Sequence, residues 1–427
     1  MRNRRNWGVT AVVVALLLSG VTPKGQAATR VYYVDRVAGS DSAAGTSPQT
    51  AWRTVGRVSA AALAPGDSVL LRRGQTWSGR LTVRSSGTAT APISIGAYGT
   101  GERPVLGGDP DRCVELAGSH VRLSDVQVGT KTTTGRCGWA GVLIAGDHDR
   151  VEGVLVTGAA AGVYVAPESE GAVITDNDLV DNNRMSVNTP GGYDDSGAFA
   201  ILVQGDRADI GWNRISGSIA ASYDYGEDGA AVEVYYGSGN HVHHNVSVDN
   251  ETFTELGTAP DDPDGVSADN VFEYNAILGS RTHAALVTRG GETDEGPVLR
   301  TVFRNNSVSL PNAAAEGVVC YGGCTDEHLE LAQNVISAAA KAAYADPGFT
   351  ATHHNVFHGL LQLDPGTTDV VVDDPGFTGP SNLRPRPDSP AVDLGTTAYA
   401  DVDLDGNPVG LDGRVEAGAY ELPVARR

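Results

Sequence analysis

The chain is 427 residues long, and its net charge of −21 results from 52 acidic residues against 31 basic ones. Because a strongly acidic surface repels phosphate groups, this charge argues against nucleic acid as a partner. Hydrophobic residues make up 41% of the chain, which excludes wholesale disorder, and the 54 glycines favour a turn-rich β protein. Lysine occurs only at Lys24, Lys131 and Lys341.

Residues 1–27 have the pattern of a secretory signal peptide. Arg2, Arg4 and Arg5 form a basic start, and residues 9–18 form an apolar run that is too short to span a membrane. Small residues near Ala27 are suited to signal peptidase cleavage. We therefore expect a secreted, extracellular protein that has no membrane partner.

The four cysteines fit two disulfides in an exported chain. We expect pairs Cys113–Cys137 and Cys320–Cys324, although spacing alone leaves the connectivity open. The paired ligands that a zinc site needs are missing.

A repeated phrase runs through the middle of the chain: an apolar strand, a turn, and an asparagine followed by an apolar or β-branched residue. No helical pattern separates the strands, so the spacing of 21 to 36 residues predicts stacked β coils about 4.8 Å apart. Stacked asparagine amides would form a hydrogen-bonded ladder along the coils. The aligned asparagines are Asn177, Asn213, Asn245, Asn275, Asn305, Asn334 and Asn355.

The beginning of the mature chain, YYVDRVAGSDSAAGTSPQTAWRTVGRV, and the later motifs DDPGF, SPAVDLG and DVDLDGNP carry a family resemblance. The chain resembles secreted right-handed parallel β-helix proteins of the pectate-lyase-like superfamily, which are carbohydrate-active. The resemblance implies an all-β, single-domain solenoid with an N-terminal capping helix, which the pattern of residues 55–64 fits, and an internal asparagine ladder. The expected divisions are a signal peptide at 1–27, a cap with the first coils at 28–110, β-helix coils at 111–372 and a C-terminal coil and cap at 373–427.

The alternation of the coils predicts one acidic pair on an outer face. Glu233 and Glu255 point outward on adjacent rungs, with β-carbons about 5 Å apart. Two carboxylates this close cannot both ionise cheaply, so one becomes an acid and the other a base, as in retaining glycoside hydrolysis. Asp228, paired with Glu255 or Glu251, is the inverting alternative. The same alignment points Ala200, Leu202, Val232, Val234, Thr254 and Leu256 inward, and Ile201 and Val203 outward.

Further polar and aromatic residues fall close to this pair in the aligned coils. Tyrosines could stack on sugar rings and His283 could hydrogen-bond a hydroxyl or a carboxylate, while the loops 184–197 and 257–267 would wall the region. The expected substrate-binding residues are Asp194, Asp195, Tyr235, Tyr236, Glu251, Arg281, His283 and Arg289.

Three functions fit these observations. The first is a monomeric glycoside hydrolase that cleaves a polysaccharide or oligosaccharide without a cofactor. The second is a calcium-dependent polysaccharide lyase, in which the acids hold Ca²⁺ and Arg184, Arg281 or Arg289 neutralises a uronate. The third is a non-catalytic carbohydrate-binding solenoid. Alternatively, Glu233 and Glu255 are ordinary solvent-exposed surface residues without a functional role.

Two other motifs resemble metal sites, but in both cases we expect a turn that binds no metal. The stretch from Asp401 to Asp412 mimics a calcium-binding loop but lacks flanking helices, so we expect a turn. His243 and His244 are expected to be turn surface, because no third ligand is apparent.

Overall fold

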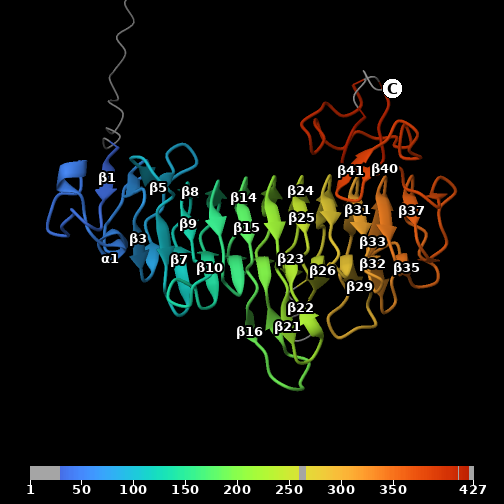
Figure 1. The fold of residues 1–427 in the computed structure, drawn as a ribbon, viewed down its shortest axis with the longest axis horizontal. Helices are drawn as coiled ribbons and strands as arrows, with labels where there is room; N and C mark the ends of the chain where they lie inside the picture. Colours follow the sequence, from blue (N-terminus) through green and yellow to red (C-terminus); the bar gives the residue numbers. More distant parts are fainter. Residues whose placement is uncertain (1–28, 259–265, 412, 423–427) are drawn as a thin grey trace, which may run out of the picture.

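The fold rests on three long parallel β-sheets that the chain visits in rotation (Figure 1). The computed structural model describes residues 29–258, 266–411 and 413–422. Sheet 1 runs from β1 (Val31–Val34) to β36 (Thr352–His353) with twelve strands, and sheet 2 from β4 (Leu81–Val83) to β38 (Leu361–Gln362) with eleven. Sheet 3 runs from β3 (Thr76–Ser78) to β39 (Val370–Val371) with twelve. The chain is therefore a parallel β-helix. The signal peptide predicted at residues 1–27 lies outside the described residues.

Inward-facing aliphatic side chains stack from coil to coil and fill the interior. In sheet 2, Val163 of β13 (Ala161–Val165) pairs with Ile201 of β18 (Phe199–Val203), and Ile201 pairs with Val232 of β23 (Ala230–Tyr235). All three have no exposed surface, and β-branched residues favour such pleated positions.

The predicted orientation of residues 201–203 was wrong. Ala200 is in the core as predicted, but Ile201 and Val203 also face inward, whereas Leu202 faces outward beside Glu233. Because side chains alternate along a strand, a one-residue error in register moves each of them to the opposite face.

An asparagine ladder runs along one corner of the coils. Asn213 Oδ1 accepts hydrogen bonds from Asn177 N at 3.0 Å and Asn177 Nδ2 at 2.9 Å, and the same pair of contacts recurs up to Asn355. The assignment of Asn305 was wrong, because Asn306 occupies its place. Asn305 is at the corner position before the ladder, where the backbone is left-handed and asparagine is tolerated.

The N-terminal end carries one short helix, α1 (Val55–Ser59), shorter than the predicted 55–64. Thr54 caps it by accepting a hydrogen bond from Arg57 N, and Val55 and Val58 are buried. Both predicted disulfides, Cys113–Cys137 and Cys320–Cys324, are present. Among the described residues, no helix is both long and apolar enough to cross a membrane.

Two antiparallel hairpins project together from the lower edge of the coils (Figure 1). One joins β16 (Met185–Val187) to β17 (Ser196–Gly197), and the other joins β21 (Ala220–Ser222) to β22 (Gly226–Asp228). Each hairpin leads into a strand of sheet 2, so both project beside the outer face of that sheet. Most of the second predicted wall, residues 257–267, lies outside the described residues.

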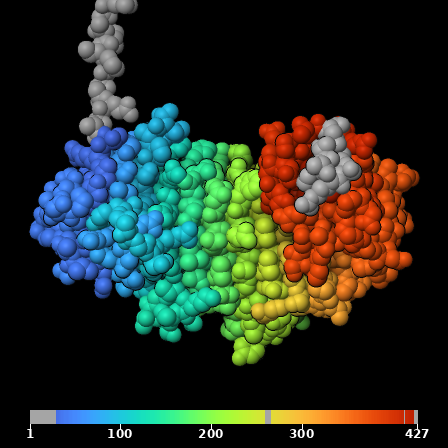
Figure 2. Space-filling model, turned by 45° about the horizontal axis from the view of Figure 1, so that its top comes forward, coloured from blue at the N-terminus to red at the C-terminus, as the bar shows by residue number. Residues whose placement is uncertain are grey.

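The segment after β39, with the small hairpin β40 (Phe377–Gly379) and β41 (Asn382–Pro385), covers later coils as a raised mass (Figure 2). His244 Nε2 lies 2.9 Å from the Val402 carbonyl, and the ring stacks between Trp212 and Tyr274. The surface-turn prediction was therefore wrong for His244, which is only 5% exposed because this segment covers it.

The calcium-like loop of this segment is organised by one buried carboxylate. Asp403 is fully buried and accepts hydrogen bonds from the backbone N–H groups of Asp405, Asn407 and Glu421. These contacts are those of a structural turn, as the sequence favours. Asp412 lies outside the described residues.

Candidate functional site

Glu233 and Glu255 occupy directly paired positions on adjacent rungs of sheet 2. Glu233 belongs to β23 and Glu255 to β26 (Thr252–Gly257), and the two residues are in register. Their inward neighbours Val232 and Thr254 have no exposed surface, whereas both glutamates are partly exposed on the outer face. This is the register that the sequence predicts for the pair.

Two more carboxyl groups lie close enough to interact with this pair. Burial raises the pKa of Asp228, at the end of β22, to about 7, and the charges of Glu255 and Glu251 add to the effect. Burial also raises the pKa of Glu251, although hydrogen bonds from Thr252 and His283 oppose it. The structure thus gathers four carboxyl groups in one electrostatic cluster, here called the acid cluster: Asp228, Glu233, Glu251 and Glu255.

Arg289 makes the central pair asymmetric. Its guanidinium forms an ion pair with Glu255 and donates from Nη1 to the Leu256 carbonyl at 2.6 Å, and the residue is 7% exposed. Its Nε also lies 2.9 Å from Glu295 Oε2, a charge contact without hydrogen-bond alignment. Arg289 is thus bound by protein groups on the side of Glu255, and its role in substrate binding stays a prediction.

Glu233, in contrast, forms no ion pair with any residue that the structure describes. Burial raises its pKa well above the usual range, and the negative charges of Glu255 and Asp228 raise it further, while Arg289 opposes them. Glu233 therefore keeps its proton to higher pH than an ordinary glutamate, while the positive charge of Arg289 lies beside Glu255. The arrangement supplies a proton donor and a carboxylate on adjacent rungs.

The remaining predicted binding residues differ in their contacts. His283 Nδ1 is 2.9 Å from Glu251 Oε1, so the histidine borders the acid cluster. Tyr235 and Tyr236 pack edge to face with ring centres 4.6 Å apart, and Tyr235 lies over Gly257, where a β-carbon would meet its ring. Arg281 is more peripheral, because it is exposed and pairs with Glu227 at 3.4 Å.

Asp194 and Asp195 lie in the loop of the first hairpin, and Asp224, a third carboxylate that the sequence analysis missed, lies in the loop of the second. Oxygens of all three lie within 4.8 Å of one another, the geometry of a possible cation site. However, Asp195 accepts hydrogen bonds from Thr189 N and Ser222 Oγ, and Asp224 accepts them from Gly191 N and Asp194 N. Burial alone would raise the pKa of Asp195, but its hydrogen bonds lower it overall. The carboxylates of Asp195 and Asp224 therefore fasten the two hairpins to each other.

An apolar patch on the outer face adjoins the acid cluster. It consists of Trp139, Ala161, Tyr164, Phe199, Leu202 and Ala230, and it is separate from the interior core. Sequence reasoning missed the patch because it pointed Leu202 inward.

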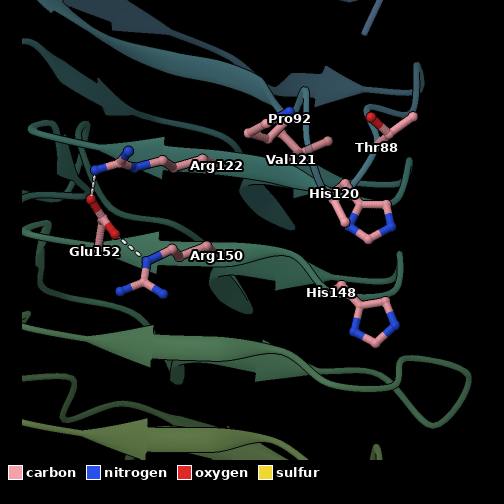
Figure 3. Close-up of a pocket in the computed structure, with 9 residues that line it drawn as sticks. Thr88, Pro92, His120, Val121, Arg122, His148, Arg150 and Glu152 are labelled. Atoms are coloured by element: carbon pink, nitrogen blue, oxygen red, sulfur yellow. Dashed lines mark hydrogen bonds and ion pairs between the residues drawn. The ribbon is translucent and has the colours of Figure 1, made fainter. Parts of the chain in front are cut away.

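A concavity of about 460 Å³ lies on sheet 1, away from the acid cluster (Figure 3). Arg122 and Arg150 both pair with Glu152 on one side, and the rings of His120 and His148 stack 5.2 Å apart on the other. Because Glu152 pairs with both guanidinium groups, it differs from Glu233, which forms no ion pair with a described residue.

Comparison with known proteins gives one local sequence match and several fold matches. No protein-family model matches the chain. A lacto-N-biosidase of Bifidobacterium longum is 41% identical over 81 residues, which are 18% of this chain and only 5% of that protein.

Among solved structures, pectate lyase Pel9A is similar with a TM-score of 0.56 and 14% identity, covering 92% of this chain and 96% of that one. XylC in complex with xylose has a TM-score of 0.54 and 9% identity, covering 83% and 77%. The GH136 lacto-N-biosidase of Eubacterium ramulus has a TM-score of 0.51 and 14% identity, covering 80% and 68%. At such identities these likenesses show the shared parallel β-helix fold.

Proposed function

We propose that this protein is a secreted glycoside hydrolase that cleaves a polysaccharide or oligosaccharide on the outer face of sheet 2. The observation that carries the proposal is the in-register pair Glu233 and Glu255, of which only Glu255 has an arginine partner. The names of the similar proteins, two of them lacto-N-biosidases, support a carbohydrate substrate. The signal-like N-terminus and the two disulfides support secretion.

In this proposal Glu233 is the general acid. Its raised pKa lets it keep a proton near neutrality and give that proton to the glycosidic oxygen as the bond breaks. Glu255, beside the Arg289 guanidinium, attacks the anomeric carbon or stabilises the positive charge that develops there.

The rung spacing favours the retaining form of this chemistry. Parallel strands lie about 4.8 Å apart, and retaining enzymes separate their two carboxyl groups by about 5 to 5.5 Å. A covalent glycosyl intermediate on Glu255 would then be released by water, which Glu233 deprotonates. Asp228 is the alternative base for the inverting route, which needs a larger separation and a water between the groups.

A polysaccharide lyase has less support from the site. A lyase must neutralise the substrate carboxylate while a base removes the neighbouring proton. The acid cluster instead presents four acids, and the buried cation beside it, Arg289, is engaged by Glu255 and Glu295. Lys131 and Lys341 pair with Asp181 and Glu316 respectively.

The proposal is tested on purified mature protein with neutral and uronic polysaccharides and a lacto-N-bioside, each with and without chelator. Reducing ends and the ultraviolet absorbance of unsaturated uronates are followed together. New reducing ends without absorbance support hydrolysis. Both signals together, lost on chelation, would replace it with a calcium-dependent lyase, and binding without either signal would leave a carbohydrate-binding solenoid.

A further inference from the structure

We propose that the apolar patch beside the acid cluster is a subsite for an uncharged sugar unit of the substrate. This inference rests on the proposed function, because the unit it holds belongs to the glycan that Glu233 and Glu255 cleave. It also names the substrate class, a neutral glycan rather than a polyuronate.

The patch is continuous with the acid cluster along the β-helix axis. Tyr164 pairs with Leu202, Leu202 with Glu233, and Glu233 with Glu255, so the four side chains form one outward row on successive rungs. At about 4.8 Å per rung, Tyr164 lies roughly 10 Å from Glu233. A glycan chain lying along this row therefore reaches the patch when one of its bonds lies over the carboxyl pair.

The shape and chemistry of the patch suit a sugar ring. Phe199 and Leu202, each 7% exposed, form an apolar floor, and the partly exposed rings of Trp139 and Tyr164 meet at 62° with centres 5.8 Å apart. The Tyr164 hydroxyl donates to Gln204 Oε1 at 2.5 Å, so a polar group borders the ring. Tyrosine and tryptophan combine an apolar body with a polar tip, which matches a sugar that has a C–H face and hydroxyl edges.

The charge of the patch selects against an acidic sugar. None of its six residues is charged, and the nearby guanidinium of Arg184 already donates to the carbonyls of Cys137 and Gly138. A uronate would find no free cation in the patch and would meet the negative field of the acid cluster. A neutral unit avoids both costs.

The test measures binding of the full-length mature protein to an array of neutral and uronic oligosaccharides. The protein carries Glu233→Gln, so that glycans bind without being cleaved. Binding is compared after a further Trp139→Ala change and after Trp212→Ala, which removes an exposed indole at the turn that follows residues 209–211 of sheet 1. Thermal melting checks that each variant is folded, and Trp139→Phe serves in place of Trp139→Ala where the latter does not fold. We expect binding of neutral glycans, weakened about tenfold or more by the Trp139 change and unaltered by Trp212→Ala.

Three results would overturn the subsite: no binding of any neutral glycan, stronger binding of uronic ones, or binding that ignores Trp139. Its failure is distinguishable from failure of the proposed function. Trp139-dependent binding by a wild-type protein that cleaves nothing would leave the subsite in place and remove the hydrolase. Cleavage with the same kcat/KM in wild type and Trp139→Ala would support the hydrolase and remove the subsite.

Discussion

Glu233 and Glu255 are paired across adjacent strands of one sheet, yet Arg289 forms an ion pair with Glu255 and none with Glu233. Two chemically identical side chains therefore have different electrostatic surroundings, because a third residue forms an ion pair with one of them. This asymmetry gives the proposed mechanism its acid and its nucleophile.

Removing either glutamate carboxylate should abolish most turnover. Glu233→Gln takes away the proton donor and Glu255→Gln the nucleophile, so each should lower kcat by about a hundred- to ten-thousand-fold. Rates are measured by reducing-end release from a cleaved glycan. The matched control is Glu330→Gln, a partly exposed glutamate of sheet 1. Wild-type rates in both pair variants would remove the assignment.

The alkaline limb of the pH–rate profile should respond in opposite directions to two neighbouring changes. Activity needs a protonated Glu233, so it falls as the pH rises through the pKa of that residue. Asp228 raises this pKa and Arg289 lowers it. Asp228→Asn should therefore move the limb to lower pH and Arg289→Gln to higher pH, each by roughly one pH unit. The readout is kcat/KM against pH, and shifts in the same direction would contradict the acid role.

A buried acid far from the proposed site should make stability depend on pH. Asp149 has no exposed surface, accepts a hydrogen bond from Val121 N at 2.7 Å, and has its pKa raised to about 8 by burial. Because the folded state binds this proton more tightly than the unfolded chain, the contribution to stability is full below about pH 4. It is lost progressively as the pH rises to about 8.

Asp149→Asn, which cannot ionise, should therefore stabilise the fold by a few kcal/mol near pH 8 and change little at pH 4. Urea unfolding at the two pH values measures this, with Asp388→Asn as an exposed control. Equal effects at both pH values would show that Asp149 does not titrate in this range.

The asparagine ladder should contribute substantially to stability. Asn275→Ala leaves the N–H of Asn245 without its acceptor inside the core, and Asn245 Nδ2 keeps only the Ile210 carbonyl. Since each buried unsatisfied group costs about 1 to 3 kcal/mol, the free energy of unfolding should fall by about 2 to 5 kcal/mol. Asn312→Ala, at a partly exposed turn, should change it little. Chemical denaturation of the three proteins compares these values.

The features that could be predicted from the sequence are those that repeat from coil to coil. Apolar alternation and recurring asparagines depend on contacts between neighbouring coils, so they lead to the parallel sheets, the ladder and the register of Glu233 with Glu255. The two errors in register, Leu202 and Asn305, are one-residue shifts. Asn305 and Asn306 are adjacent in the sequence, and what distinguishes them is the left-handed backbone of Asn305 at the corner.

Contacts between distant or irregular segments could not be predicted, because the repeat pattern does not encode them. The partner of Arg289 depends on which outward residue its long side chain reaches, and Glu255 and Glu295 both compete for it. His244 becomes buried only because residues near Val402 fold back over it. The apolar patch requires the correct orientation of Leu202 together with Trp139 from a different coil.

The most direct test of the central claim is cleavage in water enriched in heavy oxygen, followed by mass spectrometry of the products. Hydrolysis adds one solvent oxygen at each new reducing end, so we predict one heavy oxygen per cleavage in wild type. The same experiment with Glu233→Gln should yield almost no product. Products that carry no solvent oxygen and are lighter by one water would show elimination, and would contradict the hydrolase.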